Sequence, residues 1–228
     1  MLELKDITTG YNGTPLHSSF STSAKAGELI ILAGRNGAGK STLIQNLAGF
    51  LRPITGAIEI NSENLSALSI AQRAKVLSIV QTSTSVWTDL TVLEILELGA
   101  SVNTPSPTTK EITKAVERFN LTAVLHSKVE QISDGERQKT MIVRALLQNT
   151  QIILMDEPSA FLDYPSKLEL WKGIELLKNE GRTVIVSSHD LSTLSELQVI
   201  DSYWVFTKGE ILDIKAPLPL SKLMELMD

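Results

Sequence analysis

The sequence contains no cysteine among its 228 residues. Disulfide frameworks and zinc sites built on cysteine are therefore excluded, and the composition agrees with a reducing compartment. No run of about 18 apolar residues is present to cross a membrane. The N-terminal stretch MLELKDITTGY lacks the basic segment and apolar region of a secretion signal. We therefore expect a cytosolic protein without a membrane span of its own.

Basic residues are also too few and too scattered to form a nucleic-acid footprint. The chain carries 21 lysines and arginines against 26 aspartates and glutamates, which gives a net charge of -5. A nucleic-acid surface needs clustered positive charge, so we expect no nucleic-acid partner. With 43% hydrophobic and 21% charged residues, the composition is that of a globular chain with a sizeable core.

Short apolar segments alternate with helical patterns and predict an α/β fold. Leu2 to Ile7 alternates apolar and polar residues, as a half-buried strand does. Glu28 to Ala33 (ELIILA) is a continuous apolar run, typical of a strand buried on both faces of a parallel sheet. We expect further strands over 57–60, 76–80, 152–155, 183–187 and 202–206. Strands that alternate with helices favour a mostly parallel sheet with its active groups at the carboxyl ends of the strands.

The middle of the chain has helical periodicity instead. Apolar residues from Thr82 to about Asn149 recur at helical spacing, which predicts a helical subdomain inserted into the α/β core. We therefore expect one domain over 1–228, with a core of residues 1–81 and 150–228 and a subdomain of residues 82–149. Helices are also expected over 40–50, between the last three strands, and at 218–227.

A glycine-rich segment follows the ELIILA strand and matches the pattern G-x-x-x-x-G-K-[ST] in full. Glycines let the backbone N–H groups converge on phosphate, and the helix that follows adds the partial positive charge of its N-terminus. A lysine reaches the β and γ phosphates of ATP, and a hydroxyl binds Mg²⁺. A glycine-rich turn without a ligand is the alternative. The predicted nucleotide-binding residues are Gly34, Asn36, Gly37, Ala38, Gly39, Lys40, Ser41 and Thr42.

Two carboxylates end the apolar strand at 152–155. Asp156 is positioned to hold Mg²⁺ through its water shell, and Glu157 to polarise an attacking water. Two acids at a strand end can also be solvated surface residues, but the apolar strand directly upstream argues against this. The chain is thus expected to bind and hydrolyse a nucleoside triphosphate, a property that small kinases, GTPases and helicases share.

The segment ISDGERQK, Ile132 to Lys139, narrows the choice. A serine before a helix is most often a cap that touches no ligand. Here a Ser-x-Gly stretch opens a helix ahead of an Asp-Glu-Pro strand end, and this order resembles the ATP-binding cassette (ABC) ATPases. Seven motifs match that family in order: Tyr11, residues 34–42, Gln81, Ser133 to Glu136, Asp156 with Glu157, Ser159 to Asp163, and His189.

The resemblance implies a P-loop NTPase core with a mostly parallel sheet, N-terminal antiparallel strands and an inserted helical subdomain. It implies an ATP-dependent homodimer in which the phosphate loop of one copy and the signature of the other, Ser133, Asp134, Gly135 and Glu136, close on one ATP. By resemblance Tyr11 stacks on adenine, Gln81 touches Mg²⁺ and the attacking water, and His189 binds the γ-phosphate. Asp163 is retained from the family's D-loop, and His17 and His126 are left unassigned.

Three residues depart from the family pattern. Asp134 and Glu136 stand where glycine and glutamine are common and place two negative charges near a phosphate site. We hypothesise that Asp134 faces solvent, with Arg137 and Lys139 available to offset the charge. Ala160 lacks a hydroxyl that many members carry at this position of the dimer contact.

A lone cassette without a membrane span resembles the separate ATPase subunit of a bacterial importer, peripheral on the cytoplasmic face of the inner membrane. Its partners would be transmembrane permease subunits, one of whose helices docks beside Gln81 and the helix from Asp89 to Gly99, and indirectly a solute-binding protein. The stretch LTVLEILELG and the signature resemble importers of ferric siderophores, haem or cobalamin, although polar amino-acid importers approach the same pattern. A soluble ABC ATPase of an iron–sulfur assembly scaffold, a ribosome-linked cassette and a P-loop kinase remain open as alternatives.

Overall fold

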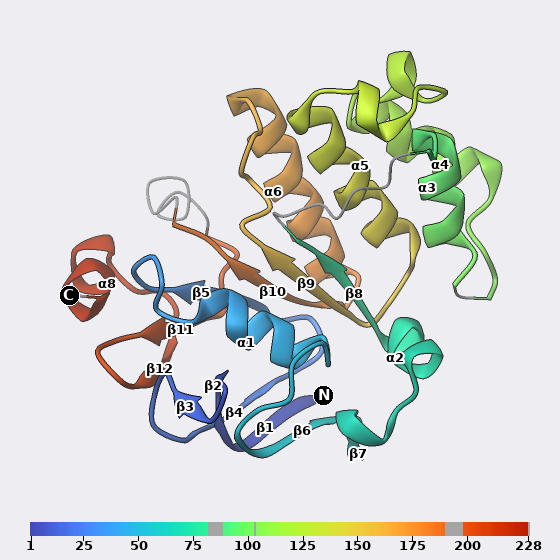
Figure 1. The fold of residues 1–228 in the computed structure, drawn as a ribbon. Helices are drawn as coiled ribbons and strands as arrows, with labels where there is room; N and C mark the ends of the chain where they lie inside the picture. Colours follow the sequence, from blue (N-terminus) through green and yellow to red (C-terminus); the bar gives the residue numbers. More distant parts are fainter. Residues whose placement is uncertain (82–88, 103, 190–197, 228) are drawn as a thin grey trace.

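The central sheet of the computed structural model has six strands in the order β12-β11-β5-β10-β9-β8 (Figure 1). The structure describes residues 1–81, 89–102, 104–189 and 198–227. Five neighbouring strands run parallel and β12 pairs antiparallel with β11 at the edge. The strand bounds are β5 Leu29–Ala33, β8 Leu77–Val80, β9 Ile152–Asp156, β10 Thr183–Ser187, β11 Ser202–Phe206 and β12 Ile211–Lys215. The predicted mostly parallel sheet is confirmed.

Both faces of this sheet are buried, as the apolar run at 28–33 predicts. In β5, Leu29, Ile31 and Ala33 belong to one hydrophobic cluster, whereas Ile30 and Leu32 belong to the other. All five residues of β5 are fully buried. The strand has no polar position because neither of its faces meets water.

A second, antiparallel sheet of order β4-β1-β6-β7 packs on one side of the central sheet. Its bounds are β1 Leu2–Thr8, β4 Phe20–Ala24, β6 Thr55–Ile60 and β7 Glu63–Asn64. The helix α1, Lys40–Leu47, lies between the two sheets (Figure 1) and buries Leu43, Ile44 and Leu47 in the shared cluster. A short hairpin of β2, Gly10–Tyr11, and β3, Thr14–Pro15, projects from this layer.

Helices cover the opposite face of the central sheet. They are α3 Val92–Ala100, α4 Thr109–Arg118, α5 Asp134–Leu147 and α6 Tyr164–Asn179, and their apolar residues form one cluster with that face. Figure 1 shows α5 and α6 beside β9 and β10, with α3 and α4 farther out. Shorter elements are α2 Ile70–Val76, α8 Leu220–Met227 and the 3-10 turns Leu65–Ala67, Thr122–Val124 and Val129–Gln131. The division into a core and an inserted subdomain stays a prediction.

Several predicted boundaries are wrong by a few residues, for local reasons. The helix expected at 89–99 begins at Val92 because Thr91 caps it, and the strand expected at 76–80 begins at Leu77 because Val76 ends α2. The first helix ends at Leu47, not at residue 50. The helical pattern expected before β11 falls mainly on residues 190–197, outside the described residues. No helix within the described ranges has the length and apolar character that a membrane span needs.

Candidate functional site

The phosphate loop, residues 34–42, joins the carboxyl end of β5 to the start of α1. Gly37 and Gly39 have positive φ angles of 80° and 104°, a backbone region that favours glycine. At Gly34 a Cβ atom would lie 2.7 Å from the Cβ of Phe206 on the neighbouring strand. The glycines are thus required by the curvature of the loop and by its close packing on β11.

Lys40 lies at the first position of α1 and is buried, with 7% of its surface exposed. Its Nζ atom donates hydrogen bonds to the carbonyl oxygens of Gly34, at 2.8 Å, and Arg35, at 3.1 Å. Burial lowers the pKa of the Lys40 ammonium, and the charges of Glu157 and Asp156 partly offset this effect. The ammonium is therefore held inside the loop at the place where phosphate oxygens would bind.

Ser41 and Asp156, both predicted to hold Mg²⁺, lie next to each other. The Ser41 hydroxyl donates to Asp156 Oδ1 at 3.0 Å, and the Ser187 hydroxyl donates to the same oxygen at 2.6 Å. Ser187 pairs with Asp156 in the register of β10 on β9, which brings the two side chains to one sheet edge. Hydroxyl and carboxylate oxygens are the donors that Mg²⁺ prefers, so Ser41 and Asp156 fit the metal. Gln81, the third predicted ligand, follows β8 and is not among the residues that line the cleft described below.

Glu157 is fixed in an uncommon backbone conformation, with a φ angle of 47°. Its N–H donates to the Ser187 hydroxyl at 2.9 Å, and to the Ser187 carbonyl at 3.2 Å. The Nδ1 atom of His189 lies 2.7 Å from Glu157 Oε2, and the His189 backbone N–H donates to the same oxygen at 3.3 Å. Two of the three predicted catalytic residues, Glu157 and His189, therefore contact each other directly, whereas the third, Gln81, is not among the residues that line the cleft.

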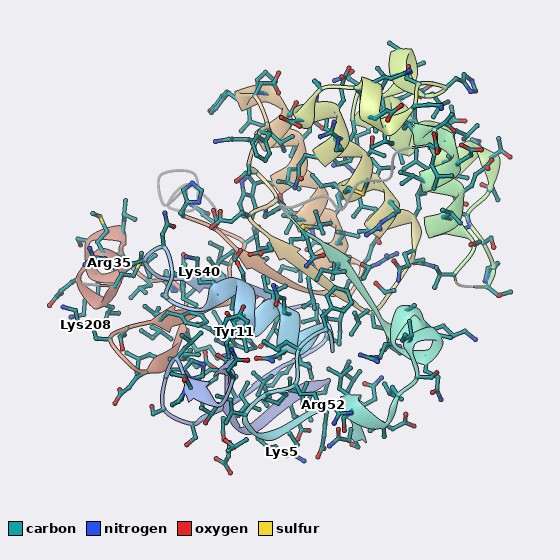
Figure 2. The ribbon with its side chains drawn as sticks, in the orientation of Figure 1. Lys5, Tyr11, Arg35, Lys40, Arg52 and Lys208 are labelled. Carbon is teal, nitrogen blue, oxygen red and sulfur yellow. The ribbon has the colours of Figure 1, made fainter. Side chains whose placement is uncertain are left out.

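A cleft of about 480 Å³ brings most of the predicted nucleotide-site residues together. Tyr11 stands at one side of it, and its hydroxyl accepts a hydrogen bond from Thr42 at 3.1 Å. Figure 2 labels Tyr11 and Lys40 beside α1. Tyr11 ends the short strand β2, and a turn with positive φ angles follows at Asn12 and Gly13. The lining residues are Tyr11, Leu16, Asn36, Gly37, Gly39, Lys40, Ser41, Thr42, Glu157 and His189.

The signature lies at the N-terminus of α5 and does not line this cleft. Ser133 is the N-cap, and its hydroxyl accepts from the Glu136 N–H at 3.3 Å. The Glu136 carboxylate accepts from the Ser133 N–H at 2.9 Å and from its hydroxyl at 2.6 Å, which completes a capping box. These bonds hold the pKa of Glu136 below its usual value, the hydroxyl bond having the larger effect. The expectation that Ser133 caps the helix is confirmed.

The two departures in the signature behave differently. Asp134 is 64% exposed at its side chain and pairs with Arg137 at 2.7 Å, as hypothesised. Glu136 instead turns back onto Ser133, so its charge stays at the helix tip. Asp163 is the N-cap of α6 and accepts from the Ser166 N–H at 3.1 Å.

Two residues of the site were not predicted from the sequence. The Ser187 hydroxyl donates to the Asp156 carboxylate and accepts from the Glu157 backbone N–H, and its place at the carboxyl end of a predicted strand is the available signal. Leu16 lines the cleft near Gly39, where a Cβ atom on Gly39 would lie 3.2 Å from Leu16 Cδ1. No sequence signal marks Leu16. His17, left unassigned, is buried and bonded through both ring nitrogens to Thr9 and Ser18, which is a structural role.

Comparison with known proteins agrees with this geometry. The family model described as ABC transporter matches residues 18–160. The high-affinity zinc uptake system ATP-binding protein of Bacillus subtilis is 30% identical, with 92% of each chain covered. A cobalamin import ATP-binding protein of Halobacterium salinarum is 28% identical over 95% of this chain, which spans only 55% of that protein. A solved structure described as the ATP-binding subunit of an ABC transporter has a TM-score of 0.88 at 27% identity, with both chains fully covered.

Proposed function

The chain belongs to the ABC transporter family and is an ATPase of that family, and from this premise we propose that it powers the import of a solute through a partner permease. The observation that carries the proposal is the cleft in which the phosphate loop, Glu157 and His189 converge, with Asp156 hydrogen-bonded to Ser41 of that loop. An ATPase of this kind must pass its conformational change to a membrane partner, because hydrolysis alone moves no solute. Its place would be the cytoplasmic face of the membrane, as a peripheral subunit.

ATP would bind with its phosphates in the loop at residues 34–42 and its adenine against Tyr11. Lys40 would exchange its two carbonyl partners for phosphate oxygens, which is favourable because its buried charge then meets an anion. Ser41 and Asp156 would hold Mg²⁺, with Gln81 as a further ligand, and the metal supplies charge neutralisation on the phosphates. Tyr11 offers a flat face that suits a base.

Glu157 would accept the proton of the attacking water, and His189 would fix the direction of that carboxylate. With Nδ1 facing Glu157 Oε2, Nε2 is the ring nitrogen that would face the γ-phosphate, and His189 donates to both oxygens only when both ring nitrogens carry a proton. Ser187 holds the Glu157 backbone in place from the neighbouring strand. The pair can thus orient water and phosphate at the same time.

The cleft is incomplete without a second copy of the chain. Ser133 and Gly135 form a helix N-terminus that attracts anions, yet they do not line the cleft of their own chain. In a head-to-tail dimer they would meet the γ-phosphate bound by the partner copy, after the Ser133 hydroxyl has left Glu136. Two ATP molecules would then close the dimer, and loss of the γ-phosphate would release it.

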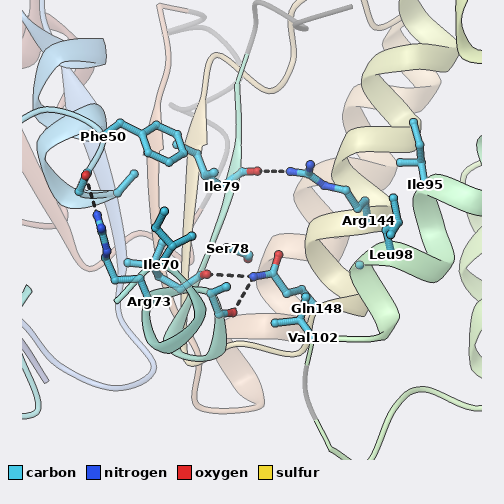
Figure 3. Close-up of a pocket in the computed structure, with 15 residues that line it drawn as sticks. Phe50, Ile70, Arg73, Ser78, Ile79, Ile95, Leu98, Val102, Arg144 and Gln148 are labelled. Carbon is cyan, nitrogen blue, oxygen red and sulfur yellow. Dashed lines mark hydrogen bonds between the residues drawn. The ribbon is translucent and has the colours of Figure 1, made fainter. Parts of the chain in front are cut away.

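A groove between α2, β8, α3 and α5 would receive a helix of the permease (Figure 3). Its volume is about 390 Å³, and three of its apolar side chains are strongly exposed: Phe50 at 63%, Ile70 at 80% and Leu98 at 50%. Exposed apolar side chains that gather in one groove mark a contact surface. Figure 3 shows Arg144 bonded to the Ile79 carbonyl. Gln148 donates hydrogen bonds to the carbonyls of Ala74 and Leu77. Movement of the docked helix would therefore reach both α5 and the strand before Gln81.

The proposed solutes are ferric siderophores, haem or cobalamin. One relative named above is a cobalamin import protein and another serves zinc uptake, so support for the class comes from the first. Selection of the solute would lie with the permease and a solute-binding protein, which meets this chain only indirectly. Residues 82–149 would move as a subdomain during the cycle.

Reconstitution with the permease tests the proposal. The full chain is purified with the membrane proteins that bind it and placed in vesicles, and ATP turnover is measured with solute-loaded binding proteins. We expect a polytopic membrane protein to copurify, and one loaded binding protein to raise turnover. Copurification with a soluble assembly scaffold and no membrane protein would contradict the importer assignment.

A further inference from the structure

Gln138 is a buried polar residue of α5, with 2% of its surface exposed. Its side-chain Nε2 atom donates a hydrogen bond to the carbonyl oxygen of Pro158 at 3.3 Å. Burial of an amide is unfavourable unless it is hydrogen-bonded, and an apolar side chain of the same size would pack equally well. The amide therefore fixes α5 to one particular peptide, the one between Pro158 and Ser159.

Gly135 lies three residues before Gln138 on the same face of α5. It packs against Phe161, at the other end of the short loop that begins at Pro158. A Cβ atom at Gly135 would lie only 2.9 Å from the carbonyl oxygen of Phe161. Gly135 and Gln138 of α5 thus lie against residues 161 and 158 respectively. Residues three apart on a helix share a face, so the two contacts together fix one face of α5 against the turn at residues 157–161.

The turn that receives these contacts is tightly closed. Glu157 and Phe161 both have left-handed backbone conformations, with φ angles of 47° and 63°. The Ala160 N–H donates to the Glu157 carbonyl at 3.0 Å, and the Leu162 N–H donates to the Ser159 carbonyl at 3.3 Å. Such strained positions persist only where the surroundings hold them. A shift of α5 would therefore be passed to the Glu157 backbone.

We infer that Gln138 is a positioning residue that couples the two ATP sites of the dimer. This rests on the proposed function, in which Ser133 at the tip of α5 serves the ATP of the partner copy while Glu157 serves the ATP of its own chain. The Gln138 contact to Pro158 ties these two groups together within one chain. Each Glu157 would then reach its active position only when the opposite site has engaged Ser133.

Mixed dimers measure this coupling. Intact subunits are combined with increasing fractions of Lys40→Ala subunits, whose own site holds no ATP for the opposite Ser133 to engage, and the ATPase rate is followed at constant total subunit concentration. Coupled sites give a rate that falls as the square of the intact fraction, whereas independent sites give a linear fall. We expect the square law in the wild-type background and a linear fall when every subunit also carries Gln138→Met, so that an equal mixture retains about a quarter and about half of the rate respectively.

Thr140→Val is the matched control. Thr140 is equally buried on α5, but its hydroxyl donates to the Glu136 carbonyl of its own helix at 2.8 Å. The square law should persist in Thr140→Val, because loss of the Thr140 hydroxyl disturbs α5 but leaves the contact between Gln138 and Pro158 in place. Gln138→Asn, which keeps the amide but is too short to reach Pro158, gives a second test if the methionine variant does not fold.

The inference is overturned if the Gln138 variants keep the square law, or if the wild-type mixture already falls linearly. Neither result touches the proposed function, which is tested separately by permease reconstitution and by ATP-dependent dimerisation of Glu157→Gln alone. A linear fall in the Thr140→Val control would also overturn it, since coupling would then depend on α5 packing in general.

Discussion

His189 Nδ1 lies 2.7 Å from Glu157 Oε2, although the two residues belong to the ends of different strands. The contact makes the imidazole a support for the carboxylate, beside the proposed phosphate site. His189→Ala removes this contact and should lower kcat by about 10²- to 10⁴-fold, the usual range for a positioned acid–base group. The ATP KM should change much less, because Lys40 and the loop still bind the phosphates.

Steady-state ATPase assays check this prediction, with His126→Ala as the matched control. His126 is an exposed histidine that does not line the cleft, and its replacement should leave kcat unchanged. A rise in the ATP KM of His189→Ala as large as the fall in kcat would instead assign the residue to ATP binding.

Glu157→Gln should separate ATP binding from ATP hydrolysis. The amide keeps the size of the side chain and can still accept a hydrogen bond from His189, but it cannot take a proton from water. We expect hydrolysis to fall by at least about 10³-fold, while an ATP-stabilised dimer accumulates. Small-angle scattering with ATP in the absence of magnesium measures the dimer. Hydrolysis at the wild-type rate would show that Glu157 is not the base.

The phosphate loop and the strand-end acids could be predicted from the sequence because each is a contiguous segment with its own local signal. Gly34 to Thr42 follows an apolar strand directly, and Asp156 ends another. Their meeting also follows from the rule that parallel strands present active groups at their carboxyl ends. The structure places Ser41 at 3.0 Å from Asp156, as that rule leads one to expect.

Contacts that depend on register between distant strands could not be predicted. Ser187 meets Asp156 because β10 pairs with β9 in one particular register, and its place at a predicted strand end does not by itself say which strand lies beside it. Gln81 has the converse problem, since its motif position is clear but its side chain does not line the cleft. At Glu136 the Ser-x-x-Glu spacing is the signal of a capping box, which the prediction of a charge near phosphate does not use.

The charge of Glu136 should weaken ATP capture in the dimer, whereas that of Asp134 should not. Glu136 binds the Ser133 hydroxyl at 2.6 Å, so its charge stays beside the proposed phosphate site. Glu136→Gln preserves a capping box and removes the charge. At a separation of several ångströms this is an effect on the order of 1 kcal/mol, and the ATP KM should fall about fivefold.

Asp134→Gly is the comparison, because the Asp134 carboxylate is engaged with Arg137 and exposed to solvent. Its ATP KM should stay within about twofold of the wild-type value, since an exposed, paired charge is well screened. Both values come from ATPase rates against ATP concentration. A sharp fall in KM for Asp134→Gly would mean that its carboxylate does reach the phosphate.

Three capping boxes should make the helices sensitive to acid. The N–H and hydroxyl of Thr91, Thr108 and Ser133 hold the pKa values of Glu94, Glu111 and Glu136 below the usual 4.5. A lowered carboxyl pKa gives stability that is complete above the ordinary value and is lost as pH falls through the lowered value. The free energy of unfolding should therefore decrease as the pH drops below about 4.5.

The double variant Glu94→Gln/Glu111→Gln tests whether the capping carboxylates cause this decrease of the unfolding free energy with falling pH. Denaturant unfolding at neutral and acidic pH should show it less stable than the wild type near pH 7, with the difference shrinking as the pH falls. Glu117→Gln, an exposed glutamate in the last turn of α4, is the control and should leave the slope unchanged. A constant difference at all pH values would exclude the capping carboxylates as its source.

The groove beside α3 should lose its permease when one apolar side chain becomes charged. Leu98 is 50% exposed and lines the groove, and burial of a leucine under a docked helix contributes about 1.5–3 kcal/mol. Leu98→Glu removes that contribution and buries a charge, so permease affinity should fall by at least about tenfold.

Leu176→Glu is the matched control, because Leu176 has the same 50% exposure but lies on α6 outside the groove. Affinity is measured by capture on detergent-solubilised permease at equal content of folded protein. An equal loss in both variants would show that the effect is one of general surface charge, and retention of binding by Leu98→Glu would place the permease on another face.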